Sequence, residues 1–196
     1  MRKVYLIRHG TTVANEQNLY YGATDLEISE KGRAELTELY ENGGYPDVSD
    51  CEVYTSGMIR TIQTLEILFP GTSYLVESGL REMNFGNFEM RAYEELKDDP
   101  EYQTWASGDF MANICPNGES GNMQSERAIK AFWDIFHRTD KDLLIVSHSG
   151  TVTAVMHSLF PDEGEHRWYW QCYGGNGYAV YFDGDKAVKH EKLPKI

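Results

Sequence analysis

Two histidines in this chain each follow directly on an apolar run. His9 comes after the run at residues 3–8 and precedes a glycine, and His148 comes after the run at residues 142–147. A short apolar run is typical of a buried strand, and open α/β sheets carry their chemistry at the carboxyl ends of their strands. We therefore expect the two strands to lie side by side and the two imidazoles to meet in one pocket.

Three charged residues also lie close to the ends of expected strands or helices. Arg8 stands beside the first histidine, Arg60 falls in the first turn of an expected helix, and Glu82 follows a short expected strand. Guanidinium groups match phosphate oxygens in a bidentate way, and helix N-termini add N–H donors. A neutral histidine can attack phosphorus, and a glutamate can protonate the leaving alkoxide. The set predicts a site for a dianionic oxyanion such as a phosphate ester.

Alternating strands and helices are expected to position these residues. The strands are expected at residues 3–8, 51–55, 73–76, 142–147, 177–182 and 186–192, the last two joined as a hairpin. The helices are expected at residues 30–40, 57–69, 120–138 and 151–160, with Ser29 and Ser56 as the first two N-caps and residues 11–28 as a long loop. The alternation predicts an α/β fold with a mostly parallel sheet, helices on both faces and a C-terminal hairpin.

Residues 85–121 interrupt this alternation. They are rich in turn residues and aromatic residues and carry two weak helical segments, at 91–97 and 100–106. We interpret them as a small cap insertion over the pocket, within a single domain that spans residues 1–196. The aromatic side chains can pack against one another or line the pocket for a flat substrate, and both alternatives stay open. These side chains are Phe88, Tyr93, Tyr102, Trp105 and Phe110.

The composition limits the partners. The chain of 196 residues has a formal net charge of −13, and an acidic surface repels nucleic acid and anionic lipid. No apolar run approaches the roughly 20 residues needed to cross a bilayer, and the N-terminus enters a strand without a signal-peptide layout. Three widely spaced cysteines without a CxxC pair favour reduced thiols. We expect a cytoplasmic protein with no nucleic-acid or membrane partner, and the sequence leaves the oligomeric state open.

Taken in order, these motifs resemble the histidine phosphatase superfamily, the phosphoglycerate mutase-like proteins. Any one motif is weak by itself, but the ordered set spans residues 1–155. The matching stretches are Arg8-His9-Gly10-Thr11-Thr12 with Asn15, the run from Tyr21-Gly22 to Gly32, Ser56 with Arg60 and Gln63-Thr64, Leu80-Arg81-Glu82 with Phe85-Gly86, Asn117-Gly118-Glu119-Ser120, and Ser147-His148-Ser149-Gly150.

The resemblance implies a three-layer α/β/α sandwich and a phosphomonoesterase that requires neither a metal nor a cofactor. It implies that His9 is the nucleophile that becomes phosphorylated and that Glu82 is the general acid and later the general base. It implies that the residues binding the phosphoryl group are Arg8, Asn15, Arg60 and His148. Further substrate contacts are expected from Tyr21, Gly22 and Ser149.

The expected cap favours a phosphatase over a mutase. Mutases of the family carry a longer insertion rich in arginine and lysine, whereas residues 85–121 hold Arg91 and Lys97 as their only cations, close to several acids. The chain differs from common family motifs at residues 87–91 and at Ser149-Gly150. These differences bear on which substrate the protein takes. A phosphoglycerate mutase and a non-catalytic phosphate-binding module stay as alternatives. The substrate is expected to be a small phosphorylated metabolite, with α-ribazole phosphate, a sugar phosphate and a nucleotide left open.

Overall fold

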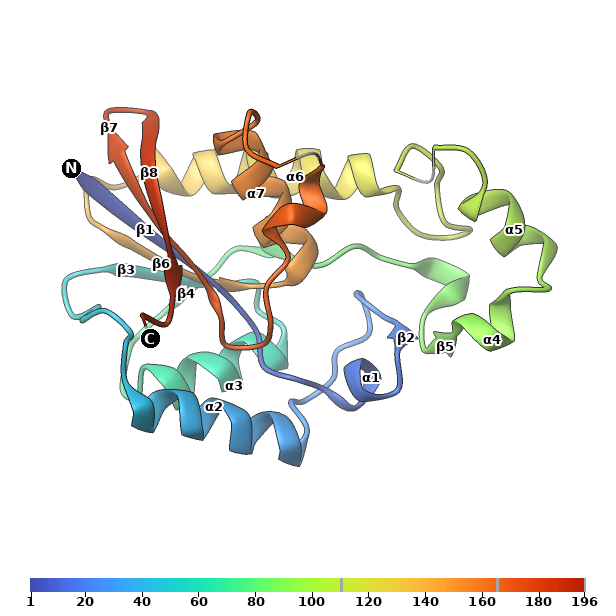
Figure 1. Ribbon diagram of the computed structural model, residues 1–196, viewed down its shortest axis with the longest axis horizontal. Helices are drawn as coiled ribbons and strands as arrows, with labels where there is room; N and C mark the ends of the chain where they lie inside the picture. Colours follow the sequence, from blue (N-terminus) through green and yellow to red (C-terminus); the bar gives the residue numbers. More distant parts are fainter. Residues whose placement is uncertain (110, 165, 196) are drawn as a thin grey trace.

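A six-stranded sheet forms the centre of the protein (Figure 1). The computed structural model describes residues 1–109, 111–164 and 166–195. The strand order is β4-β3-β6-β1-β7-β8; the first four strands pair in parallel, and the last two join them antiparallel as the C-terminal hairpin. A separate two-stranded ribbon is formed by β2 and β5. The strands are β1 Arg2–Arg8, β2 Leu19–Tyr20, β3 Glu52–Thr55, β4 Leu75–Val76, β5 Arg91–Ala92, β6 Leu143–Ser147, β7 Gly177–Asp183 and β8 Lys186–Leu193.

The two strands that carry the histidines are neighbours at the middle of the sheet. β1 pairs in parallel with β6, and Arg8 lies opposite Ser147. The backbone N–H of His9 donates to the carbonyl of Ser147 over 2.9 Å. The ring centroids of His9 and His148 are 5.1 Å apart, so the two imidazoles lie close together as expected.

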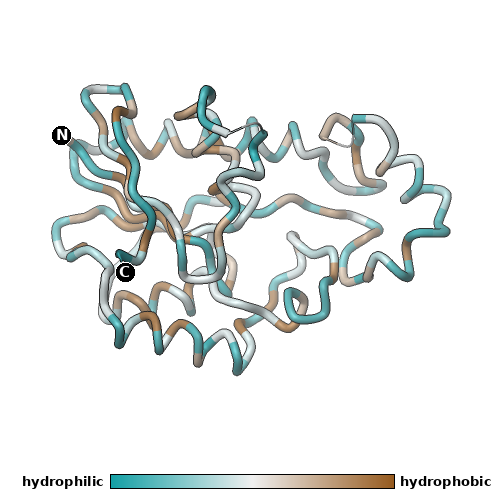
Figure 2. The backbone as a smooth tube through the Cα atoms, in the orientation of Figure 1, coloured by the Kyte–Doolittle hydropathy of each residue, from teal (hydrophilic) through white to brown (hydrophobic). Residues whose placement is uncertain are grey.

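Helices cover both faces of the sheet because successive side chains of a strand point to opposite faces. Val4 and Leu6 belong to an apolar cluster shared with α6 and α7, whereas Tyr5 and Ile7 belong to one shared with α2 and α3. Hydrophobic residues concentrate in the central strands, and the outer side of α2 is hydrophilic (Figure 2). This arrangement confirms the three-layer fold class. The helices are α1 Val13–Glu16, α2 Glu30–Asn42, α3 Ile59–Leu68, α4 Tyr93–Leu96, α5 Pro100–Ala106, α6 Gly121–Phe136 and α7 Ser149–Leu159.

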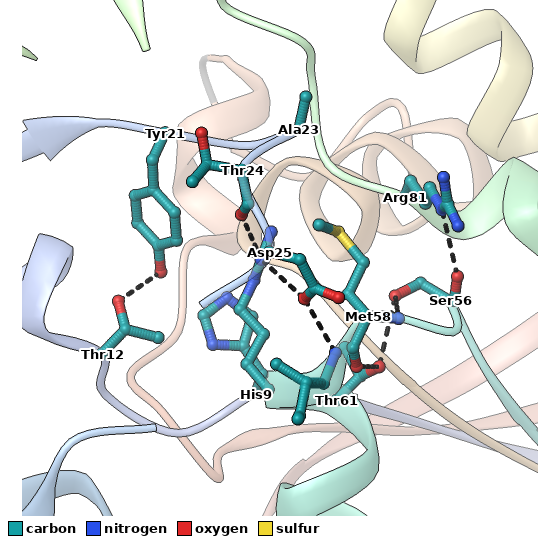
Figure 3. Close-up of polar contacts among 12 residues, drawn as sticks. His9, Thr12, Tyr21, Ala23, Thr24, Asp25, Ser56, Met58, Thr61 and Arg81 are labelled. Carbon is teal, nitrogen blue, oxygen red and sulfur yellow. Dashed lines mark hydrogen bonds and ion pairs between the residues drawn. The ribbon is translucent and has the colours of Figure 1, made fainter. Parts of the chain in front are cut away.

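The start of α3 differs from the expectation. The helix begins at Ile59 with Met58 as its N-cap, so the prediction that Ser56 caps it was wrong. A residue from a distant loop replaces the missing cap, because Asp25 Oδ1 accepts a hydrogen bond of 2.9 Å from the backbone N–H of Ile59 (Figure 3). The Ser56 hydroxyl is instead engaged with a histidine of the candidate site.

The loop expected at residues 11–28 contains two short elements. α1 begins with a capping box formed by Thr12 and Asn15, and β2 pairs antiparallel with β5. The ribbon therefore ties the loop after the first histidine to the segment 85–121. Ser29 then caps α2, as expected.

The segment 85–121 contributes to an apolar cluster separate from the two beside the sheet. The ring centroids of Phe88 and Tyr102 are 5.5 Å apart at an interplanar angle of 80°, the edge-to-face geometry that aromatic pairs favour. Tyr93 is exposed, and Phe110 lies outside the described residues. The buried members of the cluster are Met83, Phe88, Leu96, Tyr102, Trp105 and Cys115.

None of the described helices is long and apolar enough to cross a membrane. The three cysteines are free. Burial is the main cause that raises the pKa of Cys51 to about 11, of Cys115 to about 12 and of Cys172 to about 11. These thiols are therefore protonated at neutral pH.

Candidate active site

His9 has the properties of a neutral nucleophile. Its side chain is buried at the carboxyl end of β1, and its Nδ1–H donates to the carbonyl of Gly10 over 2.7 Å. Burial, followed by the positive charges of Arg60 and Arg8, holds the pKa of His9 well below its ordinary value. The imidazole is thus neutral near pH 7, and its Nε2 keeps a lone pair. A backbone carbonyl thus holds Nδ1.

Arg60 is the most deeply buried charge of the site, since its side chain is 0% exposed. A buried guanidinium is costly unless it is hydrogen-bonded. Its Nη2 donates to the carbonyl of Gly22 over 2.7 Å, and its Nη1 donates to the carbonyl of Thr24 over 3.0 Å. Its Nε donates to Nδ1 of His148 over 3.3 Å. Three of the five N–H donors of a guanidinium are thereby used, and the other two could bind phosphate oxygens.

His148 lies next to Arg60 and is completely buried. Because its Nδ1 accepts from Arg60, its proton is on Nε2, which donates to Ser56 Oγ over 2.8 Å. Burial, then the charge of Arg60, holds the pKa of His148 well below its ordinary value. Both ring nitrogens are therefore engaged within the protein, and His148 can contact a phosphoryl group only by exchanging one of these bonds. In this arrangement it orients Arg60.

Asn15 and Tyr21 form a fixed polar network with Thr12. The Tyr21 hydroxyl accepts a hydrogen bond from Thr12 Oγ1 over 2.8 Å (Figure 3). It donates to Asn15 Oδ1 over 2.8 Å. The backbone N–H of Thr12 also donates to Asn15 Oδ1, over 3.1 Å. Because the Asn15 oxygen is occupied, the donor end of its amide is the part that could bind an anion. The Tyr21 ring also lies 5.0 Å from the guanidinium carbon of Arg60, a cation–π contact.

Glu82 is held by backbone donors on both of its oxygens. Oε2 accepts from the N–H of Gly150 over 2.8 Å, and Oε1 accepts from the N–H of Met83 over 3.0 Å. Gly150 lies in the first turn of α7, so the carboxyl group of Glu82 stands at the N-terminus of this helix. A Cβ at position 150 would lie 2.2 Å from Glu82 Oε1, so a larger residue there would displace the carboxyl group. Each carboxylate oxygen still has a lone pair for a proton.

A cavity of about 470 Å³ opens beside His9. Arg8, which lines it, donates to the carbonyl of Cys172 over 2.6 Å. The buried Ser149 hydroxyl has no hydrogen-bond partner among the described residues. His148 and Gly22 were expected at the substrate, but both are buried outside the cavity lining. The predicted residues that line the cavity are Arg8, His9, Asn15, Tyr21, Arg60, Glu82 and Ser149.

Glu89 is a carboxylate that the sequence reasoning missed. It accepts hydrogen bonds from the backbone N–H groups of Gly22 at 2.9 Å, Ala23 at 3.0 Å and Thr24 at 3.1 Å, and a fourth from Phe85 at 2.9 Å. Burial opposes the charge of Glu89, but the hydrogen bonds from the Thr24 side chain and the backbone keep its pKa below the ordinary value. Glu89 is therefore a half-buried anion whose partners are mostly peptide N–H groups.

The loop that Glu89 binds is the loop that holds Arg60. The N–H groups of residues 22–24 face Glu89, and the carbonyls of Gly22 and Thr24 accept from Arg60. A Cβ at Gly22 would lie 1.7 Å from the carbonyl oxygen of Met83, so this peptide can approach so closely only as glycine. Gly22 thus positions Arg60 through its backbone. The available sequence signal for Glu89 was an acid placed between two apolar residues.

The positive charge that faces the cavity comes from arginines. The cations among the lining residues are Arg8, Arg60 and Arg167. Over the described ranges, no three His, Cys, Asp or Glu side chains are grouped so that they could hold a metal ion. Arg167 was not singled out from the sequence, because no motif surrounds it.

Known proteins share both the sequence pattern and the fold. The profile of the histidine phosphatase superfamily (branch 1) matches residues 4–191. The chain is 26% identical to the adenosylcobalamin/alpha-ribazole phosphatase of Salmonella typhimurium, over 91% of this chain and 89% of that protein. It superimposes on the alpha-ribazole phosphatase of Shigella flexneri with a TM-score of 0.84 and 26% identity, over 95% and 93% of the two chains. It superimposes on a phosphoglycerate mutase of Thermus thermophilus with a TM-score of 0.70 and 26% identity, over 96% and 97% of the chains. The chain therefore belongs to the histidine phosphatase superfamily.

Proposed function

We propose that this protein is a phosphomonoesterase that transfers the phosphoryl group of a small metabolite to His9 and then to water. The observation that carries the proposal is the Nδ1 hydrogen bond of His9 to the Gly10 carbonyl, which leaves Nε2 as a nucleophile. Arg8, Arg60 and Glu82 line the same cavity as His9. Nucleophile, anion-binding groups and proton donor are thus available to one bound substrate.

The first half-reaction forms phosphohistidine. Nε2 of His9 attacks phosphorus in line, the bond from phosphorus to the ester oxygen breaks, and the departing oxygen takes a proton from Glu82. Arg8 and Arg60 stabilise the charge on the equatorial oxygens. The donor end of the Asn15 amide adds a further hydrogen bond to these oxygens.

The second half-reaction restores the enzyme. Glu82, now a carboxylate, takes a proton from water as the water attacks phosphorus. The P–N bond breaks, inorganic phosphate leaves, and the lone pair returns to Nε2 of His9. His148 supports both steps by orienting Arg60, and its Nε2–H can exchange the bond to Ser56 Oγ for a bond to a phosphoryl oxygen.

Two features support the remaining expectations about the partners and the cellular location. The formal net charge of −13 favours a small substrate held by local arginines over a nucleic acid. Three free cysteines are compatible with a reducing cytoplasm.

A phosphatase can be separated from a phosphoglycerate mutase and from a non-catalytic module in one series. The protein is mixed with para-nitrophenyl phosphate, and phosphate release and the phosphorylated protein are both followed. It is then given 3-phosphoglycerate, and isomerisation is compared with phosphate release. The proposal expects hydrolysis and an acid-labile phosphoprotein that is absent in His9→Ala. Isomerisation faster than hydrolysis would indicate the mutase, and no turnover would indicate a binding module.

A further inference from the structure

The cavity beside His9 has a second end with different chemistry. Its lining includes the aromatic side chains Tyr20, Phe85, Tyr102, Trp105 and Trp168, none of which is among the predicted phosphate ligands. Among the lining residues Glu82 is the one acid, and it is committed to proton transfer in the proposed function. We propose that the alcohol half of the substrate is a planar aromatic group that occupies this end. The inference rests on the proposed function and names its substrate class.

The rings of the segment 85–121 and Tyr20 form one aromatic wall of the cavity. Tyr20 and Trp105 meet at 5.9 Å between ring centroids and an angle of 89°, and Phe85 and Trp105 meet at 6.4 Å and 80°. The hydroxyls of Tyr20 and Tyr102 are 2.7 Å apart and hydrogen-bonded. Because the rings are fixed by one another and by this bond, little conformational freedom is lost when a ligand binds.

Another part of the lining is a tryptophan beside a half-buried arginine. The guanidinium carbon of Arg167 lies 5.0 Å from the ring centroid of Trp168, a cation–π contact. Arg167 is itself fixed, since Nη1 donates to Ser125 Oγ over 2.6 Å and Nη2 donates to the Gly150 carbonyl over 2.9 Å. Trp168 remains 40% exposed while it lines the cavity. An exposed ring that is held in place is suited to stack on a flat ligand.

The size and polarity of the cavity favour an aromatic group over a small hydroxy acid. A volume of about 470 Å³ is within the range of pockets that enclose drug-sized molecules. A three-carbon acid could reach Arg167, but it is too small to cover the ring faces of the lining, which would stay in contact with water. A planar ring instead replaces water on the faces of Phe85, Trp105 and Trp168.

The test compares phosphate esters whose alcohols are equally basic, so that leaving-group chemistry is constant. We expect kcat/KM for 3-phenylpropyl phosphate to exceed that for propyl phosphate by on the order of 10- to 100-fold, the gain from burying a ring of this size. Equal values would overturn the inference while the phosphatase proposal stands. Failure of both esters, together with no His9-dependent phosphoprotein, would instead overturn the proposed function.

Variants locate the ring within the cavity. Trp168→Ala and Phe85→Leu should each reduce the preference for 3-phenylpropyl phosphate over propyl phosphate about 3- to 10-fold, because each removes one aromatic face. Tyr169→Ala is the matched control, since Tyr169 is exposed next to Trp168 but does not line the cavity. Thermal unfolding identifies a variant whose fold is damaged, and the other variant then decides. An unchanged ratio in a folded variant at either position would place the alcohol elsewhere and overturn the inference.

Discussion

The two ends of the cavity are held in different ways. At the phosphate end, side chains are fixed by backbone atoms: His9 by a carbonyl, Arg60 by two carbonyls and Glu82 by two N–H groups. At the aromatic end, rings such as Phe85 and Trp105 are fixed largely by one another. Backbone hydrogen bonds are directional, whereas apolar contacts tolerate replacement by side chains of similar volume. Changes at the first end should therefore remove the reaction, and changes at the second should alter the choice of substrate.

The largest effect is expected at the nucleophile. His9→Ala removes the attacking nitrogen, so turnover of every phosphate ester should fall to the background rate. No acid-labile phosphoprotein should form, as judged by intact mass after a quench that avoids acid. Because the ring of His9 packs close to His148, circular dichroism should be used to show that the variant is folded. A phosphoprotein in this variant would mean that another residue is the nucleophile.

Glu82→Gln should separate proton transfer from phosphate binding. Glutamine keeps the shape of the side chain but cannot donate or accept the proton, so turnover of an alkyl phosphate should fall on the order of 10²–10⁴-fold. The loss should be far smaller for para-nitrophenyl phosphate, whose leaving group barely needs protonation. With that substrate phosphohistidine should accumulate, because water still lacks its base, and intact mass should reveal it. Equal losses on both substrates would make Glu82 a structural residue.

Glu89→Gln should break the connection between the two ends. The segment 85–121 supplies Glu89, and Glu89 holds the peptides of Gly22 and Thr24 that in turn hold Arg60. An amide in its place offers one fewer oxygen to the N–H groups around it, so Arg60 should shift. We expect kcat/KM to fall roughly 10- to 100-fold for alkyl and aryl esters alike, since small displacements of a positioned group have effects of this size.

A second measurement must distinguish a displaced Arg60 from loss of the fold in Glu89→Gln. The inhibition constant of orthovanadate, which resembles the five-coordinate phosphorus, should rise in Glu89→Gln together with the loss of kcat/KM. Glu94→Gln is the matched control, because Glu94 is an exposed acid of the same segment that pairs with Lys97. A stable Glu89→Gln variant with normal vanadate affinity would show that Arg60 is held without Glu89.

What the sequence predicted and what it missed follow the same division. The central strands and both histidine motifs could be predicted because each is a local pattern, an apolar run followed by a polar turn. Glu89 could not, because its partners are N–H groups of a loop more than 60 residues away and a peptide N–H has no sequence signature. The prediction of the N-cap of α3 was wrong for the same reason. The acceptor for the N–H of Ile59 is Asp25, which is far away in the sequence, rather than a neighbour in the chain.

The aromatic end illustrates a further gap between sequence and structure. Packing and pocket lining were treated as alternatives for the aromatic side chains of residues 85–121, yet Tyr102 and Trp105 do both. A side chain can bury one face in a cluster and present the other to a cavity, and periodicity does not tell the two apart. Arg167 and Trp168 join the same cavity from a distant 3₁₀ helix, Arg167–Trp170, a contact that only the tertiary fold creates.

A smaller effect is expected on stability as the pH falls. The folded pKa values of His9 and His148 lie well below the ordinary value, so below about pH 6.5 the unfolded chain binds protons that the folded protein does not. The free energy of unfolding should therefore decrease as pH falls from 7 to 5.5, by up to about 1.4 kcal/mol per pH unit for each histidine. Urea unfolding of the wild type and of His148→Asn should show a shallower slope in the variant. Identical slopes would contradict the lowered pKa of His148.

The smallest effect is expected from metal removal. In the proposed reaction Arg8 and Arg60 neutralise the phosphoryl oxygens, a role that divalent ions fill in other phosphotransfer sites. Turnover of an alkyl phosphate should therefore stay the same after dialysis against excess EDTA, and added magnesium should not raise it. Arg60→Lys supplies the contrast, because a lysine keeps the charge but cannot bridge Gly22, Thr24 and the substrate at once. Activity that disappears with EDTA and returns with magnesium would mean that the arginines do not suffice, and that the phosphate end depends on an ion as well as on its backbone bonds.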